Sequence, residues 1–203
     1  MQELEIEFRN MLTEQEYHYL IDLFRLKEED FFEQTNYYLD TRAFALKNGQ
    51  SALRIRKRSD QYELTLKTPE GKGLLETTQI LGSDQAEAIL NGSNIPTGSV
   101  RNLLEKLGID YNDLEMFGAL TTIRAEKPYQ DGLLVFDKNL YGGITDFDLE
   151  YEVKDYEEGE KNFFISSLKN TKSTKKKRRI RSNVFTNMST KIKMRNISKK
   201  CSS

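Results

Sequence analysis

Apolar and polar residues alternate along several short stretches of this chain. Residues 3–9 place leucine, isoleucine and phenylalanine at every second position, with glutamate or arginine between them. Residues 144–154 repeat the pattern with four acidic side chains, and residues 51–58 alternate apolar residues with arginine. Because successive side chains of a β-strand point to opposite faces, this period predicts strands with one apolar and one charged face.

The same pattern, with turn signals between the segments, predicts about eight strands and several helices. The predicted strands span residues 3–9, 36–41, 51–58, 62–67, 74–80, 114–126, 133–140 and 144–154. The predicted helices span residues 13–27, 83–90, 99–107 and 157–168. Thr13 and Glu16 have the spacing of a capping box at the start of the first helix. Mostly hairpin-linked strands with few helices predict an α+β fold built on an antiparallel sheet or barrel.

The charged faces of these strands carry opposite signs in different parts of the chain. For any one strand, a charged face is most simply a solvated face. Asp146, Asp148, Glu150 and Glu152 share one face, however, and same-face neighbours lie only about 7 Å apart, where like charges repel. Asp146 and Asp148 are expected near the solvated rim of the sheet. A closed sheet with its charged faces inward would bring these carboxylates beside the arginines of residues 51–58.

Such an interior has a definite chemistry. Carboxylates bind hard cations such as Mg²⁺, Mn²⁺ or Ca²⁺ through oxygen. Guanidinium groups hold phosphate oxygens through forked hydrogen bonds. The two together fit a phosphate chain bound with its metal ion.

Composition narrows the possible classes of site. The chain of 203 residues suits one domain of ordinary size. Its single cysteine, Cys201, and single histidine, His18, exclude an intramolecular disulfide and a Cys-rich or multi-histidine metal site. No apolar run approaches the roughly 18 to 20 residues that a membrane span needs. The start of the chain is acidic where a secretory signal would be basic, so we expect a cytoplasmic protein.

The last segment, residues 169–203, differs in charge from the rest. It holds 13 Lys or Arg and no Asp or Glu, while the other 18 basic residues and all 32 acidic ones lie in residues 1–168. A basic segment of this kind binds nucleic acid or anionic membrane in some proteins. The simpler interpretation, which we favour, is a disordered, solvated extension following a single domain at residues 1–168.

Several motifs, in order, resemble the CYTH superfamily, the triphosphate tunnel metalloenzymes. Residues 5–9 (EIEFR) are similar to the family's E-x-E-x-K signature. Matches follow at residues 37–41 (YYLDT), 53–56 (LRIR), 64–67 (LTLK) and 149–152 (LEYE), and the opening is closest to small CYTH proteins of Gram-positive bacteria. The resemblance covers about residues 1–168. It implies an eight-stranded antiparallel β-tunnel with helices on its outside, binding a triphosphate compound with a divalent metal.

The resemblance also implies roles for individual residues. The implied ligands of a Mg²⁺ or Mn²⁺ ion are Glu5, Glu7, Asp137, Glu150 and Glu152. It implies phosphate binding at Arg54, Arg56, Lys67 and Arg124, and a catalytic part for Glu5, Glu7 and Arg9. Glu76 falls at a position that could face the tunnel.

Arg9 departs from the signature, which has lysine at this position. Arginine keeps the positive charge but cannot exchange a proton near neutral pH, because its pKa exceeds about 12. If the signature lysine takes part in proton transfer, this chain should be slow or differently specific. If the lysine acts only through its charge, Arg9 is an adequate substitute.

Three functions are compatible with such a tunnel. The first is hydrolysis of inorganic tripolyphosphate or of an organic triphosphate such as thiamine triphosphate or a nucleotide. The second is an adenylate cyclase of the class IV type, which makes cyclic AMP from ATP. The third is a module that binds polyphosphate or nucleotide without turning it over.

Overall fold

A computed structural model describes residues 1–162 of the chain. The strands are β1 (Gln2–Leu12), β2 (Phe31–Thr41), β3 (Ala52–Arg58), β4 (Gln61–Glu70), β5 (Gly73–Leu81), β6 (Leu114–Tyr129), β7 (Gly132–Tyr141) and β8 (Ile144–Val153). The α-helices are α1 (Glu14–Phe24), α2 (Ala45–Asn48), α3 (Ser83–Leu90) and α4 (Ser99–Lys106). Short 3₁₀ helices span Glu28–Asp30 and Tyr111–Asp113, and residues 156–162 are helical.

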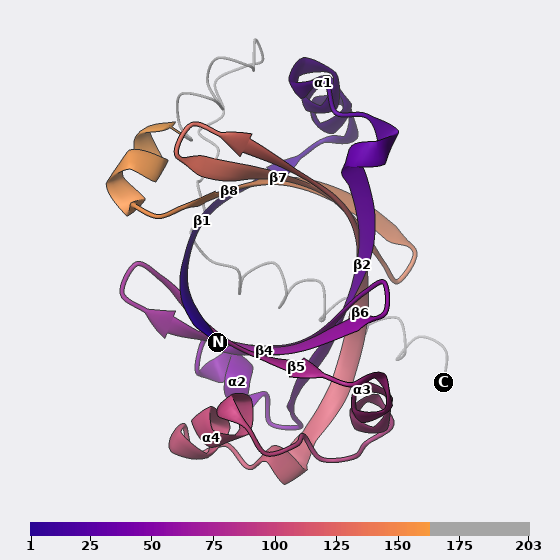
Figure 1. The fold of residues 1–203 in the computed structure, drawn as a ribbon, viewed down its shortest axis with the longest axis vertical. Coiled ribbons are helices and arrows are strands. Elements are labelled where there is room, and N and C mark those ends of the chain that lie inside the picture. Colours follow the sequence, from indigo (N-terminus) through magenta and orange to yellow (C-terminus); the bar gives the residue numbers. More distant parts are fainter. Residues whose placement is uncertain (163–203) are drawn as a thin grey trace.

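The eight strands close into one antiparallel barrel, in the order β1-β5-β4-β3-β2-β6-β7-β8, with β8 pairing back to β1. Figure 1 looks through this barrel, with the helices on the outside of the ring. Five of the strand pairs are hairpins between consecutive strands, as the turn signals predict. The antiparallel barrel with external helices is confirmed.

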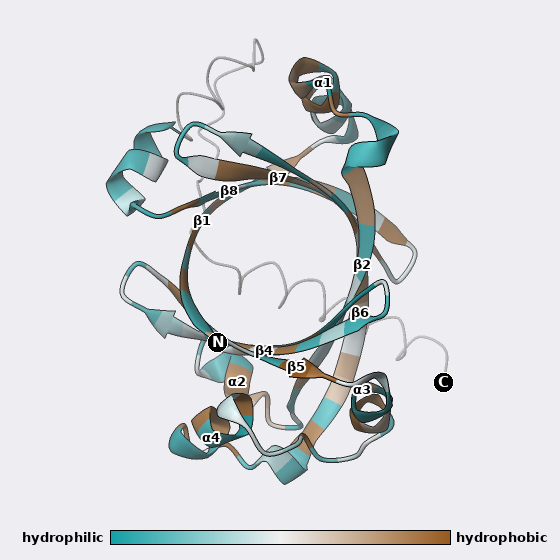
Figure 2. Cartoon of the chain, viewed as in Figure 1, coloured by the Kyte–Doolittle hydropathy of each residue, from teal (hydrophilic) through white to brown (hydrophobic). Residues whose placement is uncertain are grey.

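The apolar core lies outside the barrel in two clusters. One cluster packs α2, α3 and α4 against β2 to β5, with Leu53, Leu64 and Leu66 fully buried. The other packs α1 against β1, β6, β7 and β8, around Phe8 and Phe136. In Figure 2 hydrophobic and hydrophilic segments alternate along the helices that surround the barrel. Because the outward faces of the strands supply the core, the inward faces are free to be polar.

Helix α1 shows how sequence signals position a covering element. The side chains and backbone N–H groups of Thr13 and Glu16 form the predicted capping box. The first turn of α1 therefore starts directly after β1 ends. Tyr17 is buried, and its ring centroid lies 4.7 Å from that of Phe147 on β8. This contact ties the helix across the outside of the β1–β8 pair.

Besides shifts at the ends of elements, the structure departs from the predicted elements in β2 and α2. Strand β2 begins at Phe31 rather than residue 36, since residues 31–35 place one aromatic and further polar residues on each face and so show no alternation. Helix α2 is a single turn, too short to give a helical period. The predicted helix at residues 157–168 is confirmed at its start, and its remainder and the basic segment lie outside the described residues.

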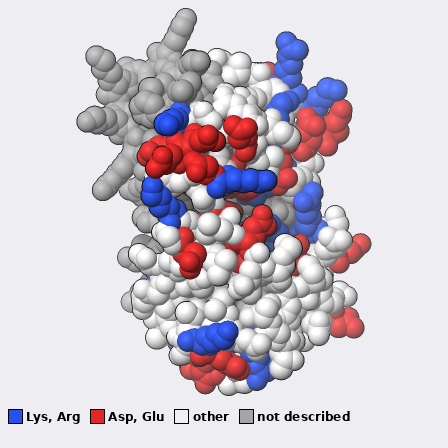
Figure 3. All heavy atoms as spheres, turned by 60° about the vertical axis from the view of Figure 1, so that its left-hand side comes forward, with Lys and Arg blue, Asp and Glu red and all other residues white. Residues whose placement is uncertain are grey.

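No helix among residues 1–162 is long and apolar enough to cross a lipid bilayer. On the face shown in Figure 3, acidic and basic side chains intermingle in the upper part of the molecule, and a broad area below is uncharged. The separation of opposite charges described next is therefore a property of the barrel interior rather than of this outer face.

Candidate active site inside the barrel

The interior of the barrel, here called the tunnel, contains a cavity of about 60 Å³. Its lining includes nine of the ten site residues predicted from the sequence, namely Glu5, Glu7, Arg9, Arg54, Arg56, Lys67, Arg124, Asp137 and Glu150. The tenth, Glu152, lines a wider space of about 610 Å³ toward the barrel end where β8 stops. Glu5, Arg54, Arg56 and Arg124 line both spaces, so the two are parts of one tunnel.

Carboxylates from β1, β7 and β8 form one side of the tunnel. This acidic wall consists of Glu7, Asp137, Asp148 and Glu150, the last three with at most 2% of their surface exposed. The register explains why they meet, because Arg9 is opposite Glu150 across the β1–β8 pair and Asp137 is opposite Asp148 across β7–β8. Four carboxylates this close are stable only with cations between them.

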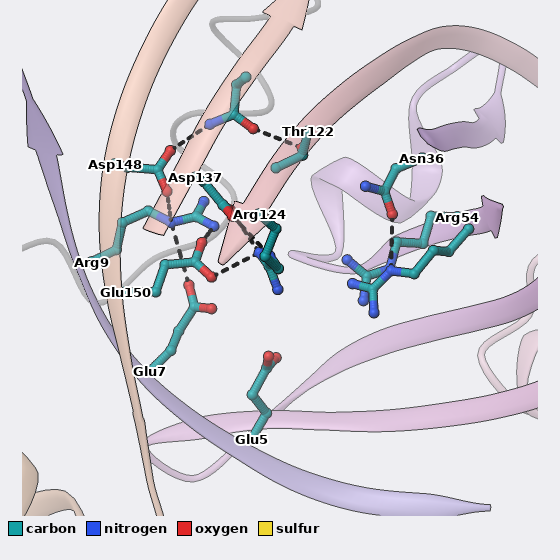
Figure 4. Close-up of polar contacts among 12 residues, drawn as sticks. Glu5, Glu7, Arg9, Asn36, Arg54, Thr122, Arg124, Asp137, Asp148 and Glu150 are labelled. Atoms are coloured by element: carbon teal, nitrogen blue, oxygen red, sulfur yellow. Dashed lines mark hydrogen bonds and ion pairs between the residues drawn. The ribbon is translucent and has the colours of Figure 1, made fainter. Parts of the chain in front are cut away.

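Arg9 is one of these cations. Its Nε lies 3.6 Å from Oδ1 of Asp148 and 3.8 Å from Oε1 of Glu7, and its Nη2 contacts Glu150 (Figure 4). Burial alone would lower the pKa of Arg9, but the carboxylates of Asp148 and Glu7 raise it above its ordinary value. The side chain that replaces the signature lysine is therefore a permanently charged bridge among three members of the acidic wall.

Arg124 is the second cation of the acidic wall. It donates from Nε and Nη2 to the two carboxylate oxygens of Asp137, at 2.8 and 2.6 Å, and from Nη2 to Glu150 at 3.2 Å. Arg124 and Asp137 are direct neighbours across the β6–β7 pair. Such a forked pair fixes both side chains, so Arg124 reaches the cavity with one edge already engaged.

The opposite side of the tunnel carries a basic wall of Arg54, Arg56 and Lys67 from β3 and β4. Arg56 donates to the amide oxygen of Asn36 at 3.3 Å, and Arg54 lies 3.7 Å from Glu76. Among the described residues, the buried Nε of Arg54 has no hydrogen-bond acceptor. The neighbouring charge of Arg54, then burial and the charge of Arg124, lower the pKa of Arg56 to about 10. These two arginines repel each other, and within residues 1–162 the one carboxylate paired with either of them is Glu76, which Arg54 shares with Lys67.

Lys67 is the neutralised member of the basic wall. Its ammonium contacts the carboxylates of both Glu5 and Glu76, and its side chain is 6% exposed. Burial raises the pKa of Glu5 to about 7, in spite of the opposing effect of Lys67. For Glu76 the effect of burial is outweighed by Lys67 and Arg54, which lower its pKa to about 2. Glu76 is thus the fixed counter-ion of Lys67, and Glu5 is the carboxyl group that can exchange a proton near neutral pH.

Comparison with known proteins agrees with this geometry. The model of the CYTH domain family matches residues 3–181. This chain belongs to the CYTH family. It is 46% identical over 162 residues to YjbK of Bacillus subtilis, provisionally named a triphosphatase, covering 80% of this chain and 84% of that protein.

Solved structures of CYTH-like proteins share the fold. A Bacillus halodurans protein, provisionally named an adenylate cyclase, is 34% identical with a TM-score of 0.80, covering 86% of this chain and 95% of its own. HpAC1 from Hippeastrum, provisionally named an adenylyl cyclase and described as having a dominant triphosphatase activity, is 21% identical with a TM-score of 0.62. That match covers 86% of this chain and 93% of the other, and shows the fold alone.

The acidic wall of this CYTH domain has donors that suit a hard divalent cation. Asp137, Asp148 and Glu150 each offer one carboxylate oxygen, and these three atoms lie within 4.8 Å of one another. All are oxygen ligands, which Mg²⁺ and Mn²⁺ prefer. Of the five ligands implied by the family resemblance, the structure places Asp137 and Glu150 in this group. Glu5, Glu7 and Glu152 lie outside it.

Asp148 is the principal residue that our sequence interpretation placed wrongly. Expected near a solvated rim, it is 1% exposed and accepts from the amide of Asn139 at 2.8 Å. Asn139 in turn accepts from the hydroxyl of Thr122 at 2.9 Å. Alternation already put Asp148 on the inward face, but its depth depends on how far β8 extends beside β7 and β1. No sequence pattern marked the uncharged tunnel residues Asn36, Asn139 and Thr122.

Proposed function

We propose that this CYTH domain is a metal-dependent hydrolase of triphosphate compounds. The observation that carries the proposal is the unbalanced charge of the basic wall, where Arg54 and Arg56 repel each other across from a cluster of carboxylates. A phosphate chain would supply the further negative charge that balances these arginines, through charge-assisted hydrogen bonds. The relationship to YjbK, at 46% identity, supports the same activity.

The two walls would divide the substrate and its metal between them. Arg54 and Arg56 would hold phosphate oxygens, with Arg124 at the boundary of the acidic wall. Asp137, Asp148 and Glu150 would hold Mg²⁺ or Mn²⁺, joined by Glu7 or Glu152 if their side chains turn inward. When bound, such an ion supplies charge neutralisation and polarisation of the phosphoryl group. Fixed donors on three sides would orient the terminal phosphorus for attack by water.

Glu5 is the residue best suited to move the proton. Its pKa of about 7 allows the carboxylate to accept a proton from the attacking water at neutral pH and to return it to solvent. Lys67, held between Glu5 and Glu76, would keep the carboxylate in position. Arg9 cannot perform this step, because its pKa is raised further above the neutral range. We assign Arg9 an electrostatic role.

The test measures phosphate and cyclic nucleotide from the same reactions. The full chain is incubated with tripolyphosphate, ATP or thiamine triphosphate, with Mg²⁺, Mn²⁺ or EDTA. We expect metal-dependent phosphate release that falls at least 100-fold in Glu150→Gln and Arg54→Gln. Arg42→Gln, which removes an exposed arginine paired with Glu115 on the outer surface, is the matched control and should keep full activity.

Each alternative has its own outcome in this assay. Cyclic AMP from ATP in place of phosphate would assign the chain to the cyclases. Tight binding of tripolyphosphate with no product under any metal would assign it to the binding modules. Metal titration of the active protein decides between Mg²⁺ and Mn²⁺. A cytoplasmic location and nucleic-acid binding through residues 169–203 stay outside this proposal.

A further inference from the structure

The inward face of β3 extends beyond the two tunnel arginines to Arg58, the last residue of the strand. Thr35 pairs with Lys57 and Asn36 with Arg56, so Arg58 lies on the same inward face as Arg54 and Arg56. The Cζ atom of its exposed guanidinium lies over the half-buried Phe32 ring, 3.7 Å from the ring centroid. Three arginines therefore follow each other at about 7 Å intervals from the cavity toward the barrel end.

Phe32 connects this pair to the phosphate-binding part of the tunnel. It is directly opposite Arg124 across the β2–β6 pair, and Arg124 lines both the inner cavity and the wider space of about 610 Å³. Strands β3, β6 and β8 all end at this mouth, while β2 and β7 begin there. The rest of the mouth is mainly acidic: Glu126 follows Arg124 on β6, the strand beside β2, Asp131 lies in the turn between β6 and β7, and Glu152 lies on β8. An aromatic and cationic surface thus shares with these carboxylates an opening wide enough for more than a phosphate chain.

We propose that Phe32 and Arg58 form a stacking platform for the planar base of a nucleoside triphosphate, whose phosphates enter toward Arg54 and Arg56. This inference rests on the proposed function and adds the class of substrate. From Arg54 to Arg58 the strand spans about 14 Å, which matches an extended chain from terminal phosphate to base. A base stacks on aromatic rings and on guanidinium planes, and one such contact contributes about 1–3 kcal/mol to binding. Inorganic tripolyphosphate, which has no ring, would bind without touching this platform.

The same hairpin provides a matched control on its other face. Lys57, one residue before Arg58, lies with Nζ 5.5 Å from the ring of Tyr62, which is buried in the apolar cluster outside the barrel. This pair has the same chemistry, a cation over an aromatic ring, but it does not face the tunnel. Loss of Lys57 therefore reports what a cation–aromatic pair contributes to the fold alone.

The experiment compares ATP with tripolyphosphate on the intact chain. Dissociation constants are measured by calorimetry with Mg²⁺ for the wild type, Phe32→Leu, Arg58→Lys and Lys57→Met. Arg58→Lys keeps the charge and removes the planar surface. We expect Phe32→Leu and Arg58→Lys to weaken ATP binding about tenfold and to leave tripolyphosphate binding within twofold. Lys57→Met should change neither.

The outcomes separate this inference from the proposed function. If the wild type binds tripolyphosphate but not ATP, or if the platform variants leave ATP binding unchanged, the platform is wrong and the triphosphatase proposal stands. Equal weakening of both ligands also overturns it, since the pair would then act through charge or fold. If the wild type binds neither ligand, the proposed function fails and the platform fails with it.

Discussion

Arg56 shows at the scale of one residue how a binding site is maintained at the expense of stability. Its pKa is lowered to about 10, first by Arg54, so its charge is held in the tunnel against repulsion. We expect Arg56→Met to raise the melting temperature of the ligand-free protein by a few degrees, because it removes that repulsion. The same change should weaken tripolyphosphate binding at least tenfold, corresponding to a charge-assisted hydrogen bond of about 1.5–3 kcal/mol.

Differential scanning calorimetry and a binding titration on one preparation measure both effects of Arg56→Met. Lys57→Met, which removes a neighbouring charge outside the tunnel, should leave tripolyphosphate affinity unchanged. A destabilised Arg56→Met protein with unchanged affinity would show that Arg56 serves the fold and not the ligand.

Arg9 carries a second prediction at this scale. Its guanidinium contacts Glu7, Asp148 and Glu150 together, and two of these carboxylates belong to the candidate metal group. Lysine has the same charge but concentrates it at one atom, so it cannot bridge all three. We expect Arg9→Lys to bind Mn²⁺ about tenfold more tightly, because carboxylate oxygens are released. Calorimetric titration with Mn²⁺ measures this directly, and unchanged affinity would show that Arg9 and the metal do not share ligands.

At the scale of elements, the closure of the barrel depends on a close approach between β5 and β1. This pair has the shortest register in the barrel, from Gln2 with Thr77 to Glu5 with Leu74. A Cβ on Gly73 would collide with the backbone oxygen of Glu5. We expect Gly73→Ala to cost about 2–3 kcal/mol of unfolding free energy, as overpacking typically does, and to reduce activity by displacing Glu5.

Gly71, in the turn just before, is the control for Gly73. Its φ is +57°, but a Cβ there would meet nothing within 4 Å. Gly71→Ala should cost only the backbone strain, about 1 kcal/mol, and leave activity intact. Chemical denaturation with an activity assay on both variants decides the matter, and equal losses would show that backbone conformation, not the approach to Glu5, is limiting.

The same scale explains how far the sequence was informative. All eight strands were predictable because a barrel with an apolar outside and a charged inside makes the period of two conspicuous, as in residues 3–9 and 144–154. The first half of β2 was missed since its inward residues, Phe32 and Gln34, differ in polarity. Ion pairs such as Arg9 with Glu150 could not be predicted, because they depend on β1 and β8 being neighbours, which local patterns do not encode.

At the scale of the whole molecule, pH should act on stability through Glu5. Its pKa in the folded protein, about 7, lies above its ordinary value of 4.5, so the folded state holds this proton more tightly than the unfolded chain. In EDTA, this group's contribution to stability should fall as pH rises from about 4.5 to 7. The pKa of Glu76 is lowered to about 2, so its contribution to stability changes only below pH 4.5. Glu5→Gln should flatten the dependence, measured as melting temperature from pH 5 to 8, whereas an unchanged slope would assign it to other groups.

The separation of charge across the tunnel also predicts that metal and substrate assist each other. Tripolyphosphate alone would satisfy the arginines of the basic wall while facing the carboxylates opposite, and Mg²⁺ alone would relieve the acidic wall while facing Arg9 and Arg124. Together they neutralise both walls and each other, so each should increase the affinity for the other by the same factor. We expect the two ligands together to raise the melting temperature by more than the sum of their separate shifts. Glu150→Gln, which removes one carboxylate of the metal group, should reduce this excess while keeping a shift from tripolyphosphate alone. Strictly additive shifts in the wild type would mean that the two walls act independently, and a tunnel of that kind would bind polyphosphate without the metal-bridged geometry that hydrolysis needs.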